Sequence, residues 1–171
     1  MSSAFETGSF NVLAVQGGGS LILSSHPASL PGATVQEAVA QYVALGATAL
    51  LSLTTQEELL ALKLAELPAI SKEAGLQWWH APIEDMGEPD EEFEQWWRAH
   101  KGTLHGLLSE GGTLAVHCWS GYGRSGTVAA RVLIERGMTP EQALEFVREQ
   151  RPGAVETVGQ ERYVLGLTAS M

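Results

Sequence analysis

The sequence has one cysteine, few basic residues and no long apolar run, and each scarcity excludes a class of protein. Its 171 residues carry 10 Lys and Arg against 20 Asp and Glu, a formal net charge of -10, which argues against a nucleic-acid binder that neutralises phosphates. A single cysteine, Cys118, can form neither an internal disulfide nor a thiolate metal site. No run of about 18 apolar residues could span a membrane. We therefore expect a cytoplasmic protein that binds neither nucleic acid nor membrane.

What is present fits one globular domain. The chain is 44% hydrophobic and long enough to enclose a full core. We expect a single, monomeric domain over residues 1–171, with residues 1–19 as an N-terminal extension or a hairpin strand. The opening residues, MSSAFETGSF, lack the basic flank and apolar run of a signal peptide.

Strand-like and helix-like segments alternate along the chain. Two apolar, β-prone runs flank glycines 17–19 and predict a hairpin over residues 10–25. Continuous apolar runs predict buried strands at 47–53, 76–83 and 113–118. Helical spacing, caps and breakers predict helices at 34–45, 55–67, after Asp90, at 125–136, after Thr139 and around Gln160. This order predicts an α/β layered domain, with a mostly parallel sheet flanked by helices.

The segment HCWSGYGRSG, residues 117–126, joins the last predicted strand to the next helix. Ligands of such folds bind beyond the carboxyl ends of strands, and the N–H groups of a helix N-terminus favour anions. Gly121, Gly123 and Gly126 let the backbone turn sharply and approach an anion closely. Arg124 adds a planar fork of donors that matches two phosphoryl oxygens. The segment therefore predicts a cradle for a phosphate dianion.

Cys118 lies at the start of this cradle. By residue type alone, a buried structural cysteine is the commoner interpretation, but a thiol beside a helix N-terminus and a cation favours a reactive thiolate. Attack on a bound phosphate would form a cysteinyl-phosphate that water then hydrolyses. One carboxyl group can protonate the leaving oxygen and later activate the water. The loop PIEDMGEPD offers Asp85, which we favour, and its rivals Glu84 and Asp90, the latter also a good helix cap.

His117, Cys118 and the run to Arg124 and Ser125 resemble the HCxxGxxR[ST] signature of cysteine-dependent protein tyrosine and dual-specificity phosphatases. The segments SLTTQEEL, HAPIEDMGEPD and RPGAVETVGQERYV resemble small atypical dual-specificity phosphatases, with the closest likeness to kinase-associated phosphatase types. The resemblance covers residues 20–167. It implies a phosphatase-type domain that hydrolyses phosphoric monoesters without a metal or other cofactor.

The resemblance also implies roles for individual residues. Cys118 would be the nucleophile, Arg124 the clamp on the phosphate and transition state, and Asp85 the general acid and then base. Ser125 would hydrogen-bond the sulfur and ease its departure in the second step. The cradle amides that would hold the phosphoryl oxygens belong to Trp119, Ser120, Gly121, Tyr122, Gly123 and Arg124.

Several points stay open at this level. His117 would tune the thiolate from behind the loop, and Gln160 would either place the hydrolytic water or be an ordinary polar residue of the last helix. Trp119 and Tyr122 would either form an aromatic rim or pack beneath the loop. Because residues 119–123 contain no lysine, a phosphoinositide substrate is less favoured than a phosphoprotein or a small phosphate ester.

Two alternative functions share the cradle. A phosphate-binding module without turnover would use the loop, but it needs neither the thiol nor an upstream acid. A rhodanese-like sulfurtransferase also uses a cysteine at the head of an anion-binding loop, but it does not need Ser125 or Asp85. Thiosulfate turnover would reveal the second alternative.

Overall fold

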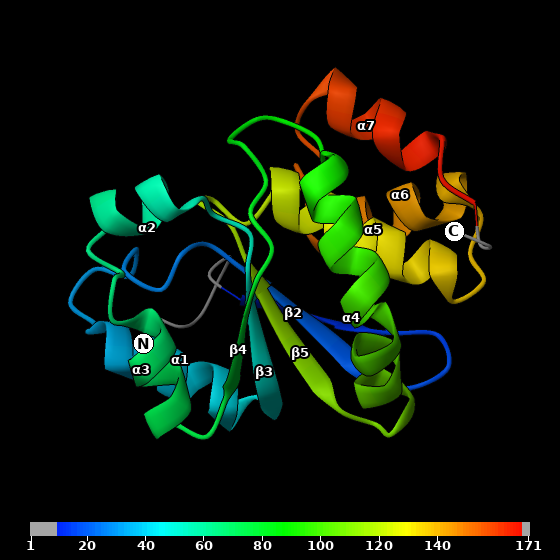
Figure 1. The fold of residues 1–171 in the computed structure, drawn as a ribbon. Coiled ribbons are helices and arrows are strands. Elements are labelled where there is room, and N and C mark those ends of the chain that lie inside the picture. The colour runs from blue at the N-terminus through cyan, green and yellow to red at the C-terminus, as the bar shows by residue number, and fades with distance from the viewer. Residues whose placement is uncertain (1–9, 169–171) are drawn as a thin grey trace.

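A five-stranded sheet organises the chain in a computed structural model that describes residues 10–168. The strand order is β1-β2-β5-β3-β4, and all neighbours run parallel except β1 with β2 (Figure 1). The strands are β1 (Phe10–Ala14), β2 (Ser20–Ser24), β3 (Ala47–Ser52), β4 (Gln77–His80) and β5 (Thr113–His117). The mostly parallel α/β sheet and the N-terminal hairpin are both as expected, while residues 1–9 of the expected extension lie outside the described residues.

Helices cover both faces of the sheet. They are α1 (Val35–Ala44), α2 (Gln56–Ala61), α3 (Leu67–Glu73), α4 (Glu91–Ser109), α5 (Gly123–Glu135), α6 (Pro140–Gln150) and α7 (Val158–Leu165). Figure 1 shows α1 to α3 on one side and α4 to α7 on the other. Helix α5 occupies the middle of its layer, and every residue from Gly123 to Ile134 is buried.

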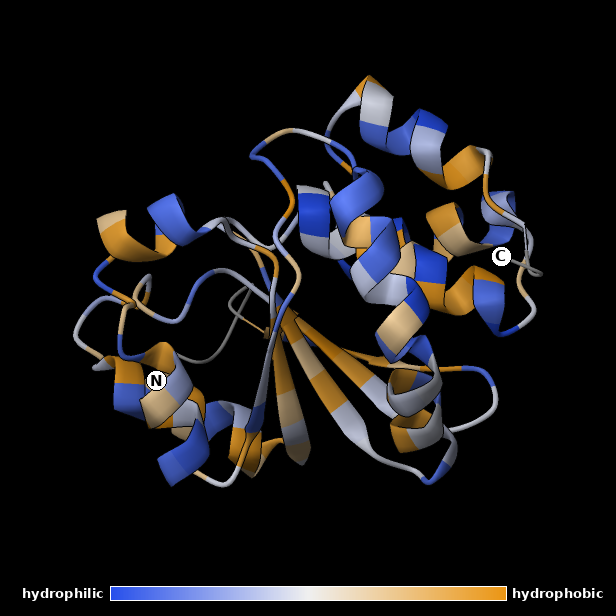
Figure 2. Ribbon diagram, viewed as in Figure 1, coloured by the Kyte–Doolittle hydropathy of each residue, from blue (hydrophilic) through white to orange (hydrophobic). Residues whose placement is uncertain are grey.

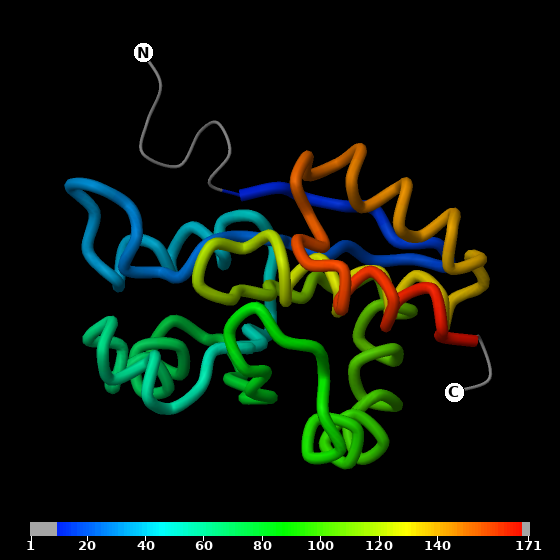
Figure 3. The backbone as a smooth tube through the Cα atoms, turned by 90° about the horizontal axis from the view of Figure 1, so that it is seen from above, coloured from blue at the N-terminus to red at the C-terminus, as the bar shows by residue number. Residues whose placement is uncertain are grey.

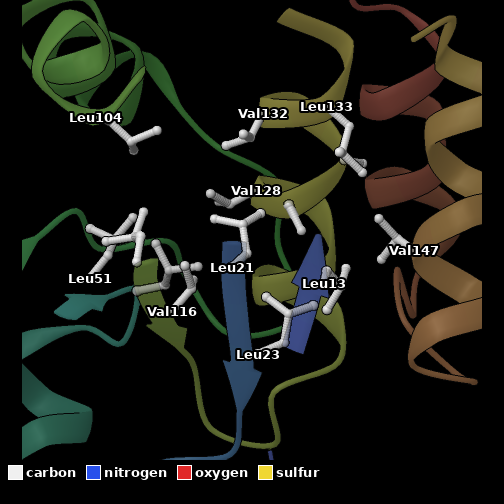
Figure 4. Close-up of a cluster of buried hydrophobic side chains, with 14 of the residues drawn as sticks. Leu13, Leu21, Leu23, Leu51, Leu104, Val116, Val128, Val132, Leu133 and Val147 are labelled. Atoms are coloured by element: carbon white, nitrogen blue, oxygen red, sulfur yellow. The ribbon is translucent and has the colours of Figure 1, made fainter. Parts of the chain in front are cut away.

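Two hydrophobic clusters, one on each face, form the core. Along β2, Leu21 and Leu23 point into the larger cluster with α4 to α7, while Ile22 points into the smaller one with α1 and α3. Figure 4 shows Leu21 and Leu23 together with Val128 and Val132 of α5. Apolar residues therefore line both faces of β2, which is typical of a parallel sheet covered by helices. Figure 2 shows hydrophobic residues along the inner strands.

The prediction of one helix over residues 55–67 was wrong. Helix α2 ends at Ala61, Lys63 adopts a left-handed backbone with φ 59°, and α3 starts afresh at Leu67. In a straight helix Leu64 and Leu67 would share a face at i, i+3 spacing, but Leu59, at i, i+5 from Leu64, would point elsewhere. The turn at Lys63 lets all three leucines enter the smaller cluster.

The carboxyl ends of the parallel strands meet at one edge of the sheet. Strand β5 ends at His117, beside Ser24 of β2 and Ser52 of β3 in the strand registers. Strand β4 ends at His80, and its chain continues as a loop that reaches α4. Seen from above in Figure 3, the yellow-green loop after β5 lies in the middle of the molecule, with the green loop after β4 beside it. This edge gathers the residues that the signature singled out.

Candidate active site

The loop from Cys118 to Tyr122 leaves β5 and leads directly into α5, which begins at Gly123. The Cys118 side chain is buried, and its Sγ accepts a hydrogen bond from the Gly121 N–H at 3.2 Å. Gly121 has φ +84°, and a Cβ at this position would collide with the backbone of Ser24. A glycine is therefore required for the chain to turn around the sulfur.

Arg124 is a buried cation in the first turn of α5. Its guanidinium donates to both carboxylate oxygens of Glu58, at 2.6 and 2.9 Å, and to the Ile83 carbonyl at 2.8 Å. Its Nη2 also donates to Asp85 Oδ1 at 3.1 Å. Burial lowers the pKa of Arg124, but the Glu58 hydrogen bonds and the nearby charges of Cys118, Glu58 and Asp85 together outweigh it, and the pKa is raised. The fork is thereby held charged and rigid at the predicted phosphate cradle.

Glu58, in the first turn of α2, is a residue of this site that the signature does not include. Its Oε1 accepts from the Thr55 backbone at 2.9 Å while the same carboxylate binds Arg124. Burial raises the pKa of Glu58, but the bonds from Arg124 and Thr55 lower it by more. The strand order alone could have suggested this contact, because α2 follows β3 at the same edge of the sheet where β5 ends.

We predict that Glu58→Gln lowers the free energy of unfolding by about 3 kcal/mol at pH 7, because it leaves a buried guanidinium without its carboxylate. The folded-state pKa of Glu58 is lowered, so its contribution is present above its ordinary pKa of 4.5 and is lost as the pH falls below that value. The difference between variant and wild type should therefore shrink at pH 3. Urea denaturation at both pH values measures it, with Glu57→Gln on the exposed side of α2 as control. Equal midpoints at pH 7 would contradict the prediction.

Asp85 is the acid that the structure brings to Arg124, in preference to its two rivals. Its carboxylate is 63% exposed and projects from the loop after β4. Asp90 instead caps α4, where its Oδ1 accepts from the Phe93 N–H at 2.9 Å. Glu84 is exposed. The cleft in front of the loop has a volume of about 270 Å³ and is lined by Asp85, Met86, Trp119, Ser120 and Glu156.

His117 lies behind the loop within a buried chain of hydrogen bonds. Its Nδ1 lies 3.0 Å from the Cys118 carbonyl and its Nε2 lies 2.6 Å from Ser52 Oγ, which accepts from Trp78 Nε1 at 2.9 Å. Burial lowers the pKa of His117 to about 4, so the ring is neutral at pH 7. A neutral ring that donates from Nδ1 and accepts at Nε2 satisfies the whole chain. His117 therefore holds the loop backbone and does not supply a positive charge.

Ser125 and Gln160 differ in how far their contacts match the expected roles. The Ser125 Oγ is buried and has no hydrogen-bond partner within the described residues, so its expected bond to the sulfur is not formed. Gln160 is fully buried; its Oε1 accepts from the Glu156 and Thr157 N–H groups and its Nε2 donates to the Gly87 carbonyl at 3.0 Å. Gln160 thus ties α7 to the loop that carries Asp85, and its role in placing water stays a prediction.

Of the two aromatic residues of the loop, one lies at the rim of the cleft and the other packs against the loop. The Trp119 side chain is 43% exposed at the rim and meets the His26 ring edge-on at 5.6 Å. Tyr122 is half-buried, and the Arg151 guanidinium carbon lies 4.2 Å from the centre of the Tyr122 ring. Trp119 can therefore contact the organic part of a substrate, whereas Tyr122 supports the loop.

Two features of residues 10–168 bear on classes of protein that the composition argued against. Among them, no helix is both long and apolar enough to cross a bilayer. No three His, Cys, Asp or Glu side chains in this part of the chain gather into a possible metal site. The groups that do converge at the sheet edge are a thiol, a guanidinium and a carboxylate.

Comparisons with known proteins point to one family. A family model described as the dual specificity phosphatase catalytic domain matches residues 33–167. A probable protein tyrosine phosphatase type IVA A of Dictyostelium discoideum is 36% identical over 81 residues, 47% of this chain and 48% of that protein. The cyclin-dependent kinase inhibitor 3 of Rattus norvegicus is 32% identical over 113 residues, 64% of this chain and 52% of that protein. The chain thus aligns with about half the length of these relatives.

A solved structure gives the same answer. Kinase associated phosphatase, with its catalytic site cysteine replaced by serine, superposes with a TM-score of 0.75 at 25% sequence identity, covering 93% of this chain and 94% of that one. The signature at residues 117–125, the five-stranded sheet and these matches agree. The chain belongs to the family of dual-specificity phosphatase catalytic domains.

Proposed function

We propose that this protein hydrolyses phosphoric monoesters on proteins, as a metal-independent tyrosine or dual-specificity phosphatase, through a cysteinyl-phosphate intermediate. The observation that carries the proposal is the convergence of three groups at one sheet edge. Cys118 Sγ lies within the turn of the loop, Arg124 follows in the first helical turn, and the Asp85 carboxylate reaches that guanidinium. A nucleophile, an anion clamp and a proton donor suffice for phosphoryl transfer.

In the first step, the Cys118 thiolate attacks phosphorus in line with the leaving oxygen. The P–S bond forms as the P–O bond breaks, and protonated Asp85 gives its proton to the departing alkoxide or phenoxide. Arg124 and the loop N–H groups hold the equatorial oxygens, where charge accumulates in the transition state. In the second step, the Asp85 carboxylate takes a proton from water, whose oxygen attacks phosphorus and releases the thiolate and inorganic phosphate. Ser125 is the candidate donor to that sulfur.

The substrate we propose is a phosphorylated protein side chain. Residues 119–123 of the cradle carry no lysine, and the cleft lining includes the carboxylates of Asp85 and Glu156, which favour a single phosphate over a multiply charged lipid headgroup. One solved structure with the same fold, of PTPMT1 at 19% identity, is a complex with PI(5)P. A phosphoinositide is therefore the comparison substrate of choice. We further propose that the protein acts as a monomer in the reducing cytoplasm, where its single cysteine would stay a free thiol.

Hydrolysis of p-nitrophenyl phosphate in excess EDTA tests the proposal. We expect turnover on the order of 1 s⁻¹ and a bell-shaped pH profile. In a separate assay without EDTA, which would complex vanadate, we expect competitive inhibition by inorganic orthovanadate. The bell shape follows because the reaction needs a thiolate and a protonated carboxyl group at the same time.

Controls separate the two alternative functions. A phosphate-binding module would bind orthovanadate without turnover, and a sulfurtransferase would form thiocyanate from thiosulfate and cyanide. Either result without release of p-nitrophenol would overturn the proposal. Loss of turnover in EDTA that Zn²⁺ or Mg²⁺ restores would also contradict it.

A further inference from the structure

Arg151 is a second buried arginine at the phosphate loop, on the side of the loop away from Arg124. It follows the last residue of α6, and its side chain is fully buried. Figure 3 shows α6 beside β1, so the end of this helix also lies close to the N-terminal hairpin. Nothing in the phosphatase signature includes Arg151, because it comes well after residue 125 in the sequence.

The Arg151 guanidinium donates to two successive carbonyl groups of the loop. Its Nε lies 2.7 Å from the Gly121 carbonyl oxygen, and its Nη2 lies 3.2 Å from that of Ser120. Its Nη1 donates to the Asn11 side chain of β1 at 2.6 Å, and Tyr122 packs against the guanidinium face. The cation is therefore fixed from three directions.

One of these carbonyls belongs to the peptide unit whose N–H faces the sulfur. The Ser120 carbonyl shares its peptide plane with the Gly121 N–H, which donates to Cys118 Sγ at 3.2 Å. A planar trans peptide points its C=O and N–H in opposite directions, so a carbonyl held outward by Arg151 holds its N–H inward. A cation on the carbonyl also polarises the unit and makes the N–H a stronger donor.

We infer that Arg151 is a positioning residue of the reaction, which aims the Gly121 and Tyr122 N–H groups into the cradle and stabilises the Cys118 thiolate through them. Asn11 orients this arginine and so links the N-terminal hairpin to the catalytic loop. The inference builds on the proposed phosphatase function but concerns the thiolate itself. It can therefore be measured without turnover.

The test is the rate of Cys118 alkylation by iodoacetamide, followed by intact mass, in wild type, Arg151→Met and Arg151→Lys. For Arg151→Met we expect a rate about tenfold lower at pH 6 and a much smaller difference at pH 9, where even an ordinary thiol with a pKa of about 8.5 is largely ionised. The kcat/KM for p-nitrophenyl phosphate at pH 6 should fall by a similar factor. Arg151→Lys should recover only part of both, since lysine lacks the planar fork. A variant that was merely less stable would not show a lower alkylation rate at pH 6 than at pH 9 relative to wild type.

Two further variants keep the inference falsifiable. Arg136→Met is the matched control, because Arg136 also donates to a backbone carbonyl, that of Gln16 in the N-terminal hairpin at 2.7 Å, but at the far end of α5. It should leave the alkylation profile unchanged. If Arg151→Met does not fold, Asn11→Ala leaves the arginine in place and should still slow alkylation at pH 6 by about twofold. Equal alkylation rates in wild type and the folded Arg151 or Asn11 variants overturn the inference, whereas wild type that alkylates normally without turnover overturns only the proposed function.

Discussion

Replacing Cys118 by serine should abolish hydrolysis of p-nitrophenyl phosphate, with kcat falling by at least about 10⁴-fold. Serine is nearly isosteric, but its hydroxyl is not ionised at neutral pH and is a far weaker nucleophile than a thiolate. The neutral ring of His117 cannot serve as its base, because its Nδ1 faces the Cys118 carbonyl and its Nε2 faces Ser52. Measurement of kcat at the optimum pH of the wild type gives the effect directly.

Substrate binding should survive this change. Arg124 is held by Glu58 and the Ile83 carbonyl and not by the sulfur, and a serine hydroxyl can accept from the Gly121 N–H in place of Sγ. Cys118→Ser should therefore bind a phosphotyrosine peptide with an affinity close to that of wild-type protein. Calorimetry with the non-hydrolysing variant measures that affinity. Substantial residual turnover by the serine variant would mean that the phosphoryl group is transferred directly to water, and the cysteinyl-phosphate step would have to be abandoned.

Asp85→Asn should lower kcat by about 10³-fold for phenyl phosphate and by distinctly less for p-nitrophenyl phosphate. Phenoxide is a poor leaving group that needs a proton as the P–O bond breaks, whereas p-nitrophenoxide leaves more readily without one. The asparagine amide can still accept the hydrogen bond that Arg124 donates at 3.1 Å, so the cradle should keep its geometry. The fall in activity on the alkaline side of the pH profile, caused by ionisation of the acid, should disappear.

Glu84→Gln provides the matched control for this experiment. It removes a carboxylate from the adjacent position of the same loop, on a side chain that is exposed to solvent. We expect kcat within about twofold of the wild-type value for both substrates, since exposed charges at this distance are strongly screened. Should Glu84→Gln lose activity and Asp85→Asn keep it, the general acid has been assigned to the wrong neighbour.

The sequence was sufficient to locate most of the fold because the informative signals are local. Alternation of apolar runs with capped helices predicted the strands β3 and β5 and the helix α5 close to their observed positions. The signature at residues 117–125 likewise carries its own geometry, since the glycine at position 121 is required by a φ of +84°. The break between α2 and α3 was missed because it depends on which leucines reach a cluster assembled from distant segments.

The supporting residues of the site could not be found in the same way. Glu58 meets Arg124 across 66 positions of sequence, and its visible local role as a helix cap is also real. From the sequence alone, Arg151 would be expected at the surface, because it is a charged residue next to the helix-breaking Pro-Gly pair. In the structure it is only 2% exposed. Glu58 and Arg151 each bind a partner that is distant in sequence and comes close only when the sheet edge is assembled. Local pattern therefore predicts the reacting groups, and tertiary contact determines the groups that hold them.

The burial of α5 from Gly123 to Ile134 makes local opening of this helix as costly as unfolding of the whole domain. Regions that open locally in native proteins are those with few buried contacts, and a helix enclosed on all sides can open only when the domain itself unfolds. The amides of residues 123–134 should therefore rank among the slowest to exchange with solvent. The loop on the Asp85 side of the cleft is exposed, so its amides should exchange faster and it should open locally more often. Motion at the site should thus be confined to the loop that carries Asp85, while the helical end of the cradle, at Gly123 and Arg124, keeps its shape.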